Sequence, residues 1–244
     1  MRVEIVSTPE EFARRAADVV CATVRVKPAA ALGLPSGRTP LGLYAELARR
    51  VRVDEADFRE ATAFAIDELY GVPPDHPATN AAYFRRELTP HVPLRALHVM
   101  DSEAADPGAE CGRFCRLIDH AGGLDLVVLG IGRNGHLAFN EPGSAFDSRA
   151  RKVALDGASR EPYVSHFGSL EATPASGLTL GIADLLAARR ALLLANGAEK
   201  AEAIAQALEG PATEAVPASA LQQHPDLIVV LDGEAAARLR QSPS

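Results

Sequence analysis

Short apolar runs alternate with longer stretches of helical periodicity along this chain. The runs have the length of buried strands, and the stretches between them repeat their apolar residues at helical spacing. The predicted strands span residues 30–34, 61–66, 96–100, 124–129, 191–195 and 227–231. This alternation is typical of an α/β fold with a mostly parallel sheet, here of about six or seven strands flanked by helices.

Two predicted helices have recognisable beginnings. Thr8 can cap the first one, Pro9 suits its first position, and Glu11 completes a capping box. Thr39 and Pro40 have the same arrangement after the run at 30–34, so Thr39 is predicted to cap the next helix.

The chain has no internal repeat, low-complexity segment or Pro/Ser-rich linker, and one domain over residues 1–244 is predicted. Residues 156–174 have weak periodicity and several polar side chains. This segment is either a mobile lid or a solvated connection, and the pattern alone leaves both readings open.

Composition and net charge limit the kinds of molecule that this protein is expected to bind. The net charge of −7 argues against a nucleic-acid or anionic-membrane partner, whereas a small phosphate can still be held by local groups. No apolar signal core begins the chain, and no run reaches the roughly 18 apolar residues that span a bilayer. We therefore expect a soluble, cytoplasmic protein. A metal site would need more Cys or His near the three cysteines, so none is predicted.

Candidate chemistry lies where predicted strands end. In the first such turn, Gly33 to Pro40, backbone N–H groups and a helix start can hold an anion. Ser36, Gly37, Arg38 and Thr39 supply the donors, although an ordinary strand-to-helix turn has the same pattern. Asp67 and Glu68 follow the next strand, either as general bases or as simple caps.

The loop from Gly130 to Pro142 (GIGRNGHLAFNEP) follows the clearest buried strand. His136 can change protonation near neutral pH, Glu141 can orient its ring, and Asn134 can hold the other ring nitrogen. The glycines also match a dinucleotide-binding pattern with Asp156 as the acidic partner, but Pro142 interrupts the helix that this alternative requires.

At these loops the sequence resembles the glucosamine-6-phosphate deaminases, a family of glucosamine/galactosamine-6-phosphate isomerases within the 6-phosphogluconolactonase superfamily. The resemblance covers nearly the whole chain in order. Three segments carry it: LGLPSGRTP, FAIDELYGVPPDHP and LGIGRNGHLAFNEPGSAFDSR. It implies a three-layer, modified Rossmann-like fold with neither a metal nor an organic cofactor.

The resemblance also implies a reaction. His136, supported by Glu141 and Asn134, would open the pyranose ring of an amino-sugar 6-phosphate, and Asp67 would move a proton between sugar carbons. Lys200 and the Gly37–Thr39 turn would hold the phosphate, and water would release ammonia. Ser36, Arg38, Glu68 and His166 are further predicted to contact the substrate or its phosphate. The chain would thus be a hydrolase of amino-sugar metabolism that converts glucosamine 6-phosphate to fructose 6-phosphate. Its partner would be this small phosphosugar, and it would act as a monomer or a homo-oligomer.

This sequence departs from the family pattern at several positions. Asn134 stands where many members have Asp, which predicts a lower imidazole pKa. Leu69 stands where Tyr is usual. Arg38 replaces a small residue, and His166 replaces a phosphate-binding Arg of the lid segment. We hypothesise that Arg38 supplies the guanidinium that His166 lacks.

Other readings stay open on the sequence alone. Arg151 matches a basic position of the allosteric site that some members have, but Val153 stands where a second basic residue is expected. A lactonase or another phosphosugar isomerase would use the same scaffold. A non-catalytic sugar-phosphate sensor is a third reading, against which the retained acid–base residues argue.

Overall fold

The computed structural model describes residues 1–240. Within that range, seven parallel strands form one sheet in the order β1-β10-β9-β6-β2-β3-β5. Their bounds are β1 (Arg2–Val6), β10 (Leu227–Asp232), β9 (Ala191–Ala195), β6 (Leu126–Gly130), β2 (Ala31–Leu34), β3 (Thr62–Ala65) and β5 (Ala96–His98). The predicted α/β class and parallel sheet are confirmed, and the three-layer arrangement implied by the resemblance is present.

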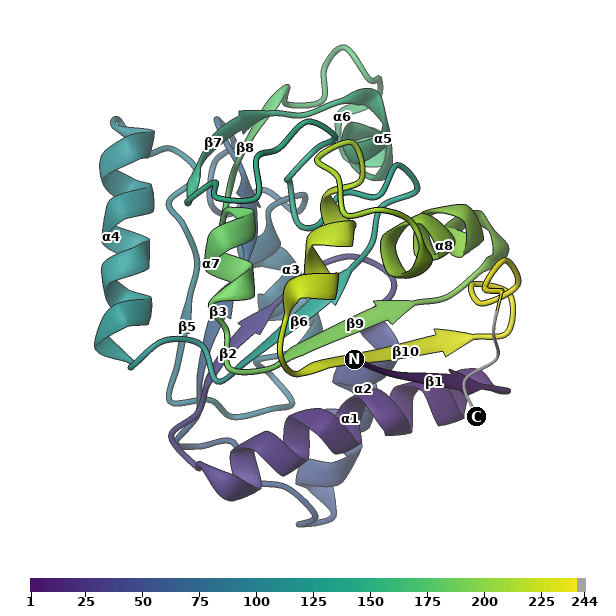
Figure 1. Ribbon diagram of the computed structural model, residues 1–244. Helices are drawn as coiled ribbons and strands as arrows, with labels where there is room; N and C mark the ends of the chain where they lie inside the picture. Colours follow the sequence, from purple (N-terminus) through teal and green to yellow (C-terminus); the bar gives the residue numbers. More distant parts are fainter. Residues whose placement is uncertain (241–244) are drawn as a thin grey trace.

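Helices cover both faces of this sheet (Figure 1). The α-helices are α1 (Pro9–Val26), α2 (Leu41–Arg52), α3 (Asn80–Glu87), α4 (Pro107–His120), α5 (Gly157–Arg160), α6 (Val164–Phe167), α7 (Ile182–Leu186) and α8 (Ala201–Glu209). Short 3-10 turns are η1 (Glu161–Tyr163), η2 (Ala198–Lys200) and η3 (Pro217–Gln223). The first three α-helices pack on one face, and α4, α7 and α8 pack on the other.

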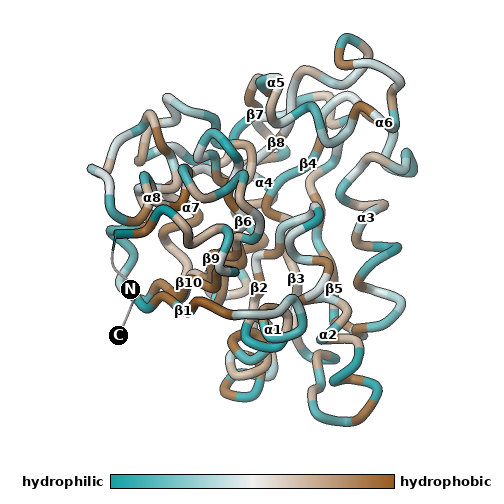
Figure 2. Tube along the Cα trace, turned by 90° about the vertical axis from the view of Figure 1, so that its right-hand side faces the viewer, coloured by the Kyte–Doolittle hydropathy of each residue, from teal (hydrophilic) through white to brown (hydrophobic). Residues whose placement is uncertain are grey.

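Alternation along the strands explains these two layers. Successive strand residues point to opposite faces. In β6, Leu126 and Val128 therefore join the core beneath α1 and α2, whereas Val127 and Leu129 join the core beneath α4 and α7. The apolar strands β9 and β10 are coloured brown in Figure 2.

The predictions for the two helix starts are only partly confirmed. Thr8 caps α1 by accepting a hydrogen bond from the Glu11 backbone N–H, but the Glu11 carboxylate bonds to Ser7 N rather than to Thr8 N. The predicted cap at Thr39 is wrong, because α2 begins at Leu41 with Pro40 in the cap position. Strand β1 was not predicted, since its half-exposed residues do not form an apolar run.

A second, smaller sheet was also missed. Strands β4 (Asp67–Leu69), β8 (Ser176–Thr179) and β7 (Arg151–Ala154) pair antiparallel. Only Ile66 separates β3 from β4, so the chain passes directly from one sheet into the other. In Figure 1 this small sheet lies above the large one, next to α5 and α6.

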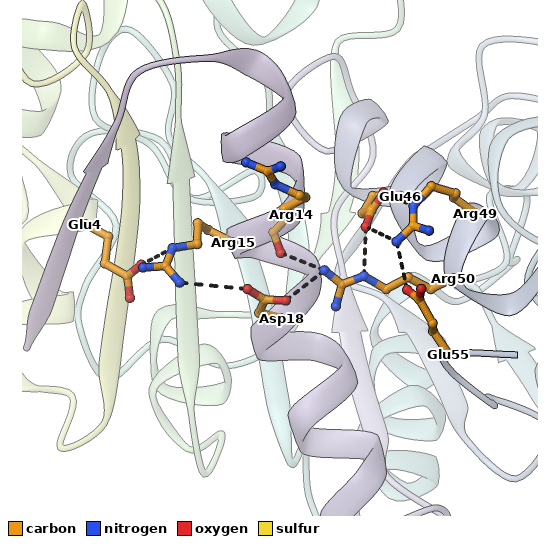
Figure 3. Close-up of polar contacts among 8 residues, drawn as sticks. All are labelled: Glu4, Arg14, Arg15, Asp18, Glu46, Arg49, Arg50 and Glu55. Atoms are coloured by element: carbon orange, nitrogen blue, oxygen red, sulfur yellow. Dashed lines mark hydrogen bonds and ion pairs between the residues drawn. The ribbon is translucent and has the colours of Figure 1, made fainter. Parts of the chain in front are cut away.

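An ion-pair network joins β1, α1 and α2 on the outer face of the molecule (Figure 3). Arg50 is its centre, with Nη2 2.7 Å from Asp18 and Nε 2.9 Å from Glu46. The other charged members extend this chain of alternating charges to both sides: Glu4, Arg15, Arg49 and Glu55. Arg50 also donates to the backbone carbonyl of Arg14. Among residues 1–240, none of the helices is long and apolar enough to cross a membrane.

Candidate active site

Four neighbouring strands bring the candidate residues to one edge of the large sheet. The parallel order β9-β6-β2-β3 aligns their carboxyl ends, where ligands of open α/β sheets bind. Lys200 lies in the turn after β9, His136 in the loop after β6, and Ser36 in the turn after β2. Asp67 follows β3. Segments far apart in the sequence thus meet at one edge of the sheet.

The loop after β6 is a compact turn and not a helix start. A Cβ on Gly132 would lie 2.3 Å from the His136 ring, so only glycine lets the imidazole pack there. Gly135 has a positive φ of 84° and packs against Val216. Since no helix follows Gly135, the dinucleotide-binding alternative is wrong.

Asn140 fixes the far end of this loop from inside the protein. It has no exposed surface, and its amide donates to the carbonyls of Leu137 and Leu180 at 3.0 and 2.8 Å. Its oxygen accepts from Arg151, which also reaches Ser144 at 3.1 Å. The Arg151 guanidinium is thus engaged in holding the His136 loop.

Carboxylates and amides surround the His136 ring. Glu141 Oε2 lies 3.6 Å from Nδ1, and the Ser159 hydroxyl lies 3.2 Å from the same nitrogen. Asn134 donates to Glu141 at 3.0 Å and to Asp156 at 2.8 Å. Its oxygen accepts from the His136 backbone N–H, so the expectation that Asn134 holds a ring nitrogen is wrong.

The surroundings keep the imidazole neutral. Burial, followed by the positive charge of Lys200, lowers the pKa of His136 to about 4. The direction agrees with the sequence prediction, but the main cause is burial rather than the Asn134 amide. Burial raises the pKa of Glu141, while donors from Ser159, Asn134 and the Asp156 backbone act in the opposite direction. At neutral pH the ring can therefore accept a proton.

Asp67 and Glu68 have different surroundings although they are adjacent. Asp67 is 8% exposed and accepts a 2.7 Å hydrogen bond from the Asn80 amide. Burial, with a contribution from the Glu68 charge, raises the pKa of Asp67 to about 7.

Glu68 is 1% exposed, and burial raises its pKa as well. Its oxygens accept backbone N–H bonds from Leu69, Asn80 and Ala81, which ties β4 to the first turn of α3. This geometry favours a positioning role for Glu68, and its predicted contact with substrate stays a prediction.

Two tyrosines donate hydrogen bonds to the backbone of the turn after β2. Tyr44 donates to the Pro35 carbonyl at 2.6 Å, and Tyr83 donates to the Gly37 carbonyl at 2.7 Å. Gly37 has a φ of 99°, which turns the backbone toward Arg38 and Thr39. Burial lowers the pKa of Lys200, and the charges of Arg133 and Arg38 lower it further. These cations gather beside the turn, as an anion site requires.

The segment 156–174 lies over this edge of the sheet. Ser159 contacts His136. Burial, followed by the charges of Asp67 and Glu68, raises the pKa of the Tyr163 phenol, and a hydrogen bond with Ser36 acts in the opposite direction. Ser159 and Tyr163 are four positions apart in consecutive helical turns, so they are near neighbours. The segment therefore covers both parts of the site.

Side-chain contacts fasten this segment to the rest of the molecule. Glu161 forms an ion pair with Arg133 of the His136 loop. Phe167 stacks on His76 with ring centroids 4.7 Å apart. His166 lies exposed on α6, and its predicted role in substrate binding stays a prediction.

Sequence reasoning missed several residues of this edge. Asn80 was not singled out, and Arg133 was read only as one residue of the glycine-rich loop. Ser159 and Tyr163 lie in a segment without periodicity, where no local pattern separates a solvated residue from a buried one. Within residues 1–240, the structure contains no cluster of three or more His, Cys, Asp or Glu that could hold a metal ion.

Sequence comparison places these features in a known family. A family model described as glucosamine-6-phosphate isomerases/6-phosphogluconolactonase matches residues 7–229. A glucosamine-6-phosphate deaminase of Bacillus velezensis is 42% identical over 229 residues, covering 93% of this chain and 95% of that protein. One of Rhodococcus opacus is 42% identical over 242 residues, covering 98% and 93%.

Structure comparison agrees. A monomeric glucosamine-6-phosphate deaminase superposes with a TM-score of 0.93 at 38% identity, covering 98% of this chain and all of that chain. A 6-phosphogluconolactonase from Trypanosoma brucei, at 21% identity and a TM-score of 0.78 with 98% of each chain covered, shares the fold. The resemblance seen in the sequence is confirmed, and the chain belongs to the glucosamine-6-phosphate isomerase/6-phosphogluconolactonase family.

Proposed function

We propose that this protein is a glucosamine-6-phosphate deaminase, which converts glucosamine 6-phosphate and water to fructose 6-phosphate and ammonia. One observation carries the proposal. A neutral histidine with carboxylate support lies at the end of β6, and a buried, proton-holding aspartate lies at the end of β3, on either side of the cationic turn after β2. The relatives at 42% identity carry this activity in their names.

Ring opening is the step that His136 serves. The neutral imidazole takes the proton of the anomeric hydroxyl as the bond between C1 and the ring oxygen breaks. It then passes that proton to the former ring oxygen, which leaves an open-chain aldehyde. Glu141, which lies 3.6 Å from Nδ1, stabilises the imidazolium that forms in between.

Asp67 serves the isomerisation. Its carboxylate removes the proton from C2 and returns it to C1, while the aldehyde oxygen gains a proton and the nitrogen loses one, so that C1 becomes an alcohol carbon and C2 an imine carbon. Water then adds to C2, and ammonia leaves. A pKa near 7 suits this task, because the same group must accept a proton and give it back at neutral pH.

The phosphate group of the substrate holds the open-chain sugar in place. Backbone N–H groups of Gly37 to Thr39 and the Ser36 hydroxyl line the turn, and Lys200 and Arg38 supply positive charge. In this proposal Arg38 provides the guanidinium that His166 lacks. Binding energy from this remote group orients the reacting carbons.

An enzyme-coupled assay of ammonia release tests the proposal. The purified protein is expected to release ammonia from glucosamine 6-phosphate and to form fructose 6-phosphate in equal amount. The H136Q variant provides the matched inactive control. Hydrolysis of 6-phosphogluconolactone without ammonia release from any hexosamine 6-phosphate would contradict the proposal and favour the lactonase. Tight binding without turnover would favour the sensor.

A further inference from the structure

The geometry between His136 and Glu141 lacks a direct hydrogen bond. The distance of 3.6 Å from Nδ1 to Oε2 exceeds that of an ordinary hydrogen bond. The Ser159 hydroxyl lies 3.2 Å from Nδ1, and a hydrogen bond from the same side chain lowers the pKa of Glu141. Ser159 is only 4% exposed, so its hydroxyl must find partners within the protein.

We propose that Ser159 is a positioning residue for His136, whose hydroxyl links the ring Nδ1 to the Glu141 carboxylate. The inference rests on the proposed function and deepens it. It assigns part of the proton-transfer machinery to α5, in the segment 156–174, rather than to the loop that holds the histidine.

The position of the carboxylate indicates the direction of these bonds. Glu141 accepts from the Asn134 amide at 3.0 Å and from the Asp156 backbone N–H at 3.2 Å, as an ionised carboxylate does. Its Oε2 also lies 3.6 Å from Nδ1, so its negative charge favours a hydrogen on that nitrogen. The Ser159 oxygen, 3.2 Å from Nδ1, then accepts from Nδ1–H, and its single hydrogen is left to point toward Glu141. This tautomer leaves Nε2 without a proton, so Nε2 is the nitrogen that takes the anomeric proton.

The position of Ser159 is set by its neighbours in the segment. Asp156 caps α5 by accepting from the Ser159 backbone N–H at 2.9 Å, and it also accepts from Asn134 at 2.8 Å. The ion pair between Glu161 and Arg133 holds the next turn to the same loop. The contacts that place the segment therefore also place the Ser159 hydroxyl beside His136.

The electrostatic surroundings of the ring do not depend on the serine. The charged groups that face His136 are Glu141 of its own loop, Asp156 at the start of the segment, and Lys200 from the turn after β9. Ser159→Ala removes no charge from this set. A change in the tautomer of the ring in that variant reports the lost hydroxyl itself.

The test compares S159A with S159T, which keeps a hydroxyl, and with S165A, which removes an exposed serine of the same segment. Nitrogen-15 NMR of labelled histidine, assigned with H136Q, gives the tautomer of His136 without any substrate. Steady-state kinetics gives kcat and KM. The reduced, open-chain 2-amino-2-deoxyglucitol 6-phosphate is the binding probe, because it needs no ring opening.

We expect wild type, S159T and S165A to carry the neutral-ring proton on Nδ1, and S159A to gain the Nε2-protonated form. In S159A, kcat should fall about 10-fold, a part of the roughly 100- to 10,000-fold that a general base contributes. The affinity of S159A for the open-chain probe should stay within about 2-fold of wild type, because the phosphate site is intact.

Two results would overturn the assignment. One is an unchanged tautomer in S159A. The other is a loss of kcat matched by an equal loss of probe binding, which would make the serine a merely structural support of the segment. If wild type releases no ammonia, the proposed function fails, yet the tautomer measurement still decides the role of Ser159.

Discussion

Two regions of the molecule shift the pKa values of their carboxylates in opposite directions. On the outer face of α1 and α2, carboxylates alternate with arginines in the network of Figure 3. There, hydrogen bonds from Arg49 and Arg50 lower the pKa of Glu46 to about 2. At the carboxyl edge of the large sheet, burial and the neighbouring Glu68 raise the pKa of Asp67 to about 7.

The cations differ in the same way. Arg49 bonds to both Glu46 and Glu55. The pKa of Lys200 is instead lowered by burial and by the like charges of Arg133 and Arg38, against the opposing charge of Glu199. The outer face thus arranges opposite charges for stability, and the sheet edge holds like charges together at a cost in stability. Such an arrangement is characteristic of sites that must bind an anion and transfer a proton.

The largest effect is expected from Asp67→Asn. Loss of the base should lower kcat at least about 100-fold, since general acid–base groups contribute roughly 100- to 10,000-fold. The same change should raise the free energy of unfolding at about pH 8 by about 1–3 kcal/mol. Ammonia-release kinetics and urea denaturation measure the two effects. Asp54→Asn is the control and should change neither, because it alters an exposed carboxylate at a backbone position with φ of 56° that asparagine also adopts.

The sign of the stability change follows from the two pKa values. The folded-state pKa of Asp67, about 7, lies above the ordinary value of 3.8. The protonated form therefore stabilises the fold at low pH, and this contribution is lost as the pH rises through about 7. Asparagine does not titrate and avoids the loss. A D67N protein that is less stable than wild type at about pH 8 would contradict the raised pKa.

Arg38→Ala should have the second largest effect. Removing one of the cations beside the phosphate turn should raise KM for glucosamine 6-phosphate about 10-fold, with kcat within about 3-fold. The lower positive charge should also let the pKa of Lys200 rise, because the Arg38 charge helps to lower it. Arg59→Ala removes a surface arginine paired with Asp57 and serves as the control. An unchanged KM would remove Arg38 from the phosphate site.

A smaller effect is expected from Asn80→Ala, which removes the 2.7 Å hydrogen bond to Asp67. That bond lowers the aspartate pKa, so its loss should raise the pKa further. Because the base acts in its ionised form, the acidic limb of the kcat/KM profile should move up by about 0.5–1 pH unit. Activity should fall more at about pH 6 than at about pH 8. If the acidic limb of the kcat/KM profile does not move, the ionisation of Asp67 does not determine its position.

The smallest effect is expected on the outer face. Glu46→Gln should lower the free energy of unfolding at neutral pH by about 1 kcal/mol and leave kcat and KM unchanged. Its folded-state pKa of about 2 lies below the ordinary 4.5, so its contribution is present above 4.5 and lost as the pH falls through about 2. Denaturation at about pH 3.5 should therefore show a narrower gap between variant and wild type than at about pH 7.

Much of the fold could be predicted because its signals are local. The buried strands are apolar runs, and strands such as Ala191–Ala195 appear with the predicted bounds. The loop after β6 could be singled out because glycines flank His136 and a carboxylate follows. Parallel topology then brings this loop, the Ser36 turn and Asp67 to the same edge, which makes the position of the site predictable from strand ends alone.

The remainder depends on contacts between distant segments. Strand β4 has only three residues, two of them acidic, and it becomes a strand only by pairing with β8. Ser159 and Tyr163 lie in a polar segment that becomes buried when it lies over the sheet edge. The partner of Asn134 was misjudged for the same reason, because the position of Asp156 beside it is a tertiary fact.

The Asn134 amide, which donates to two acids at once, makes positions 134 and 156 an epistatic pair. An aspartate at 134 would bring a third negative charge against Glu141 and Asp156, with no hydrogen to offer either of them. We therefore expect N134D to cost less activity in a D156N background than in the wild type, which a double-mutant cycle on kcat would measure.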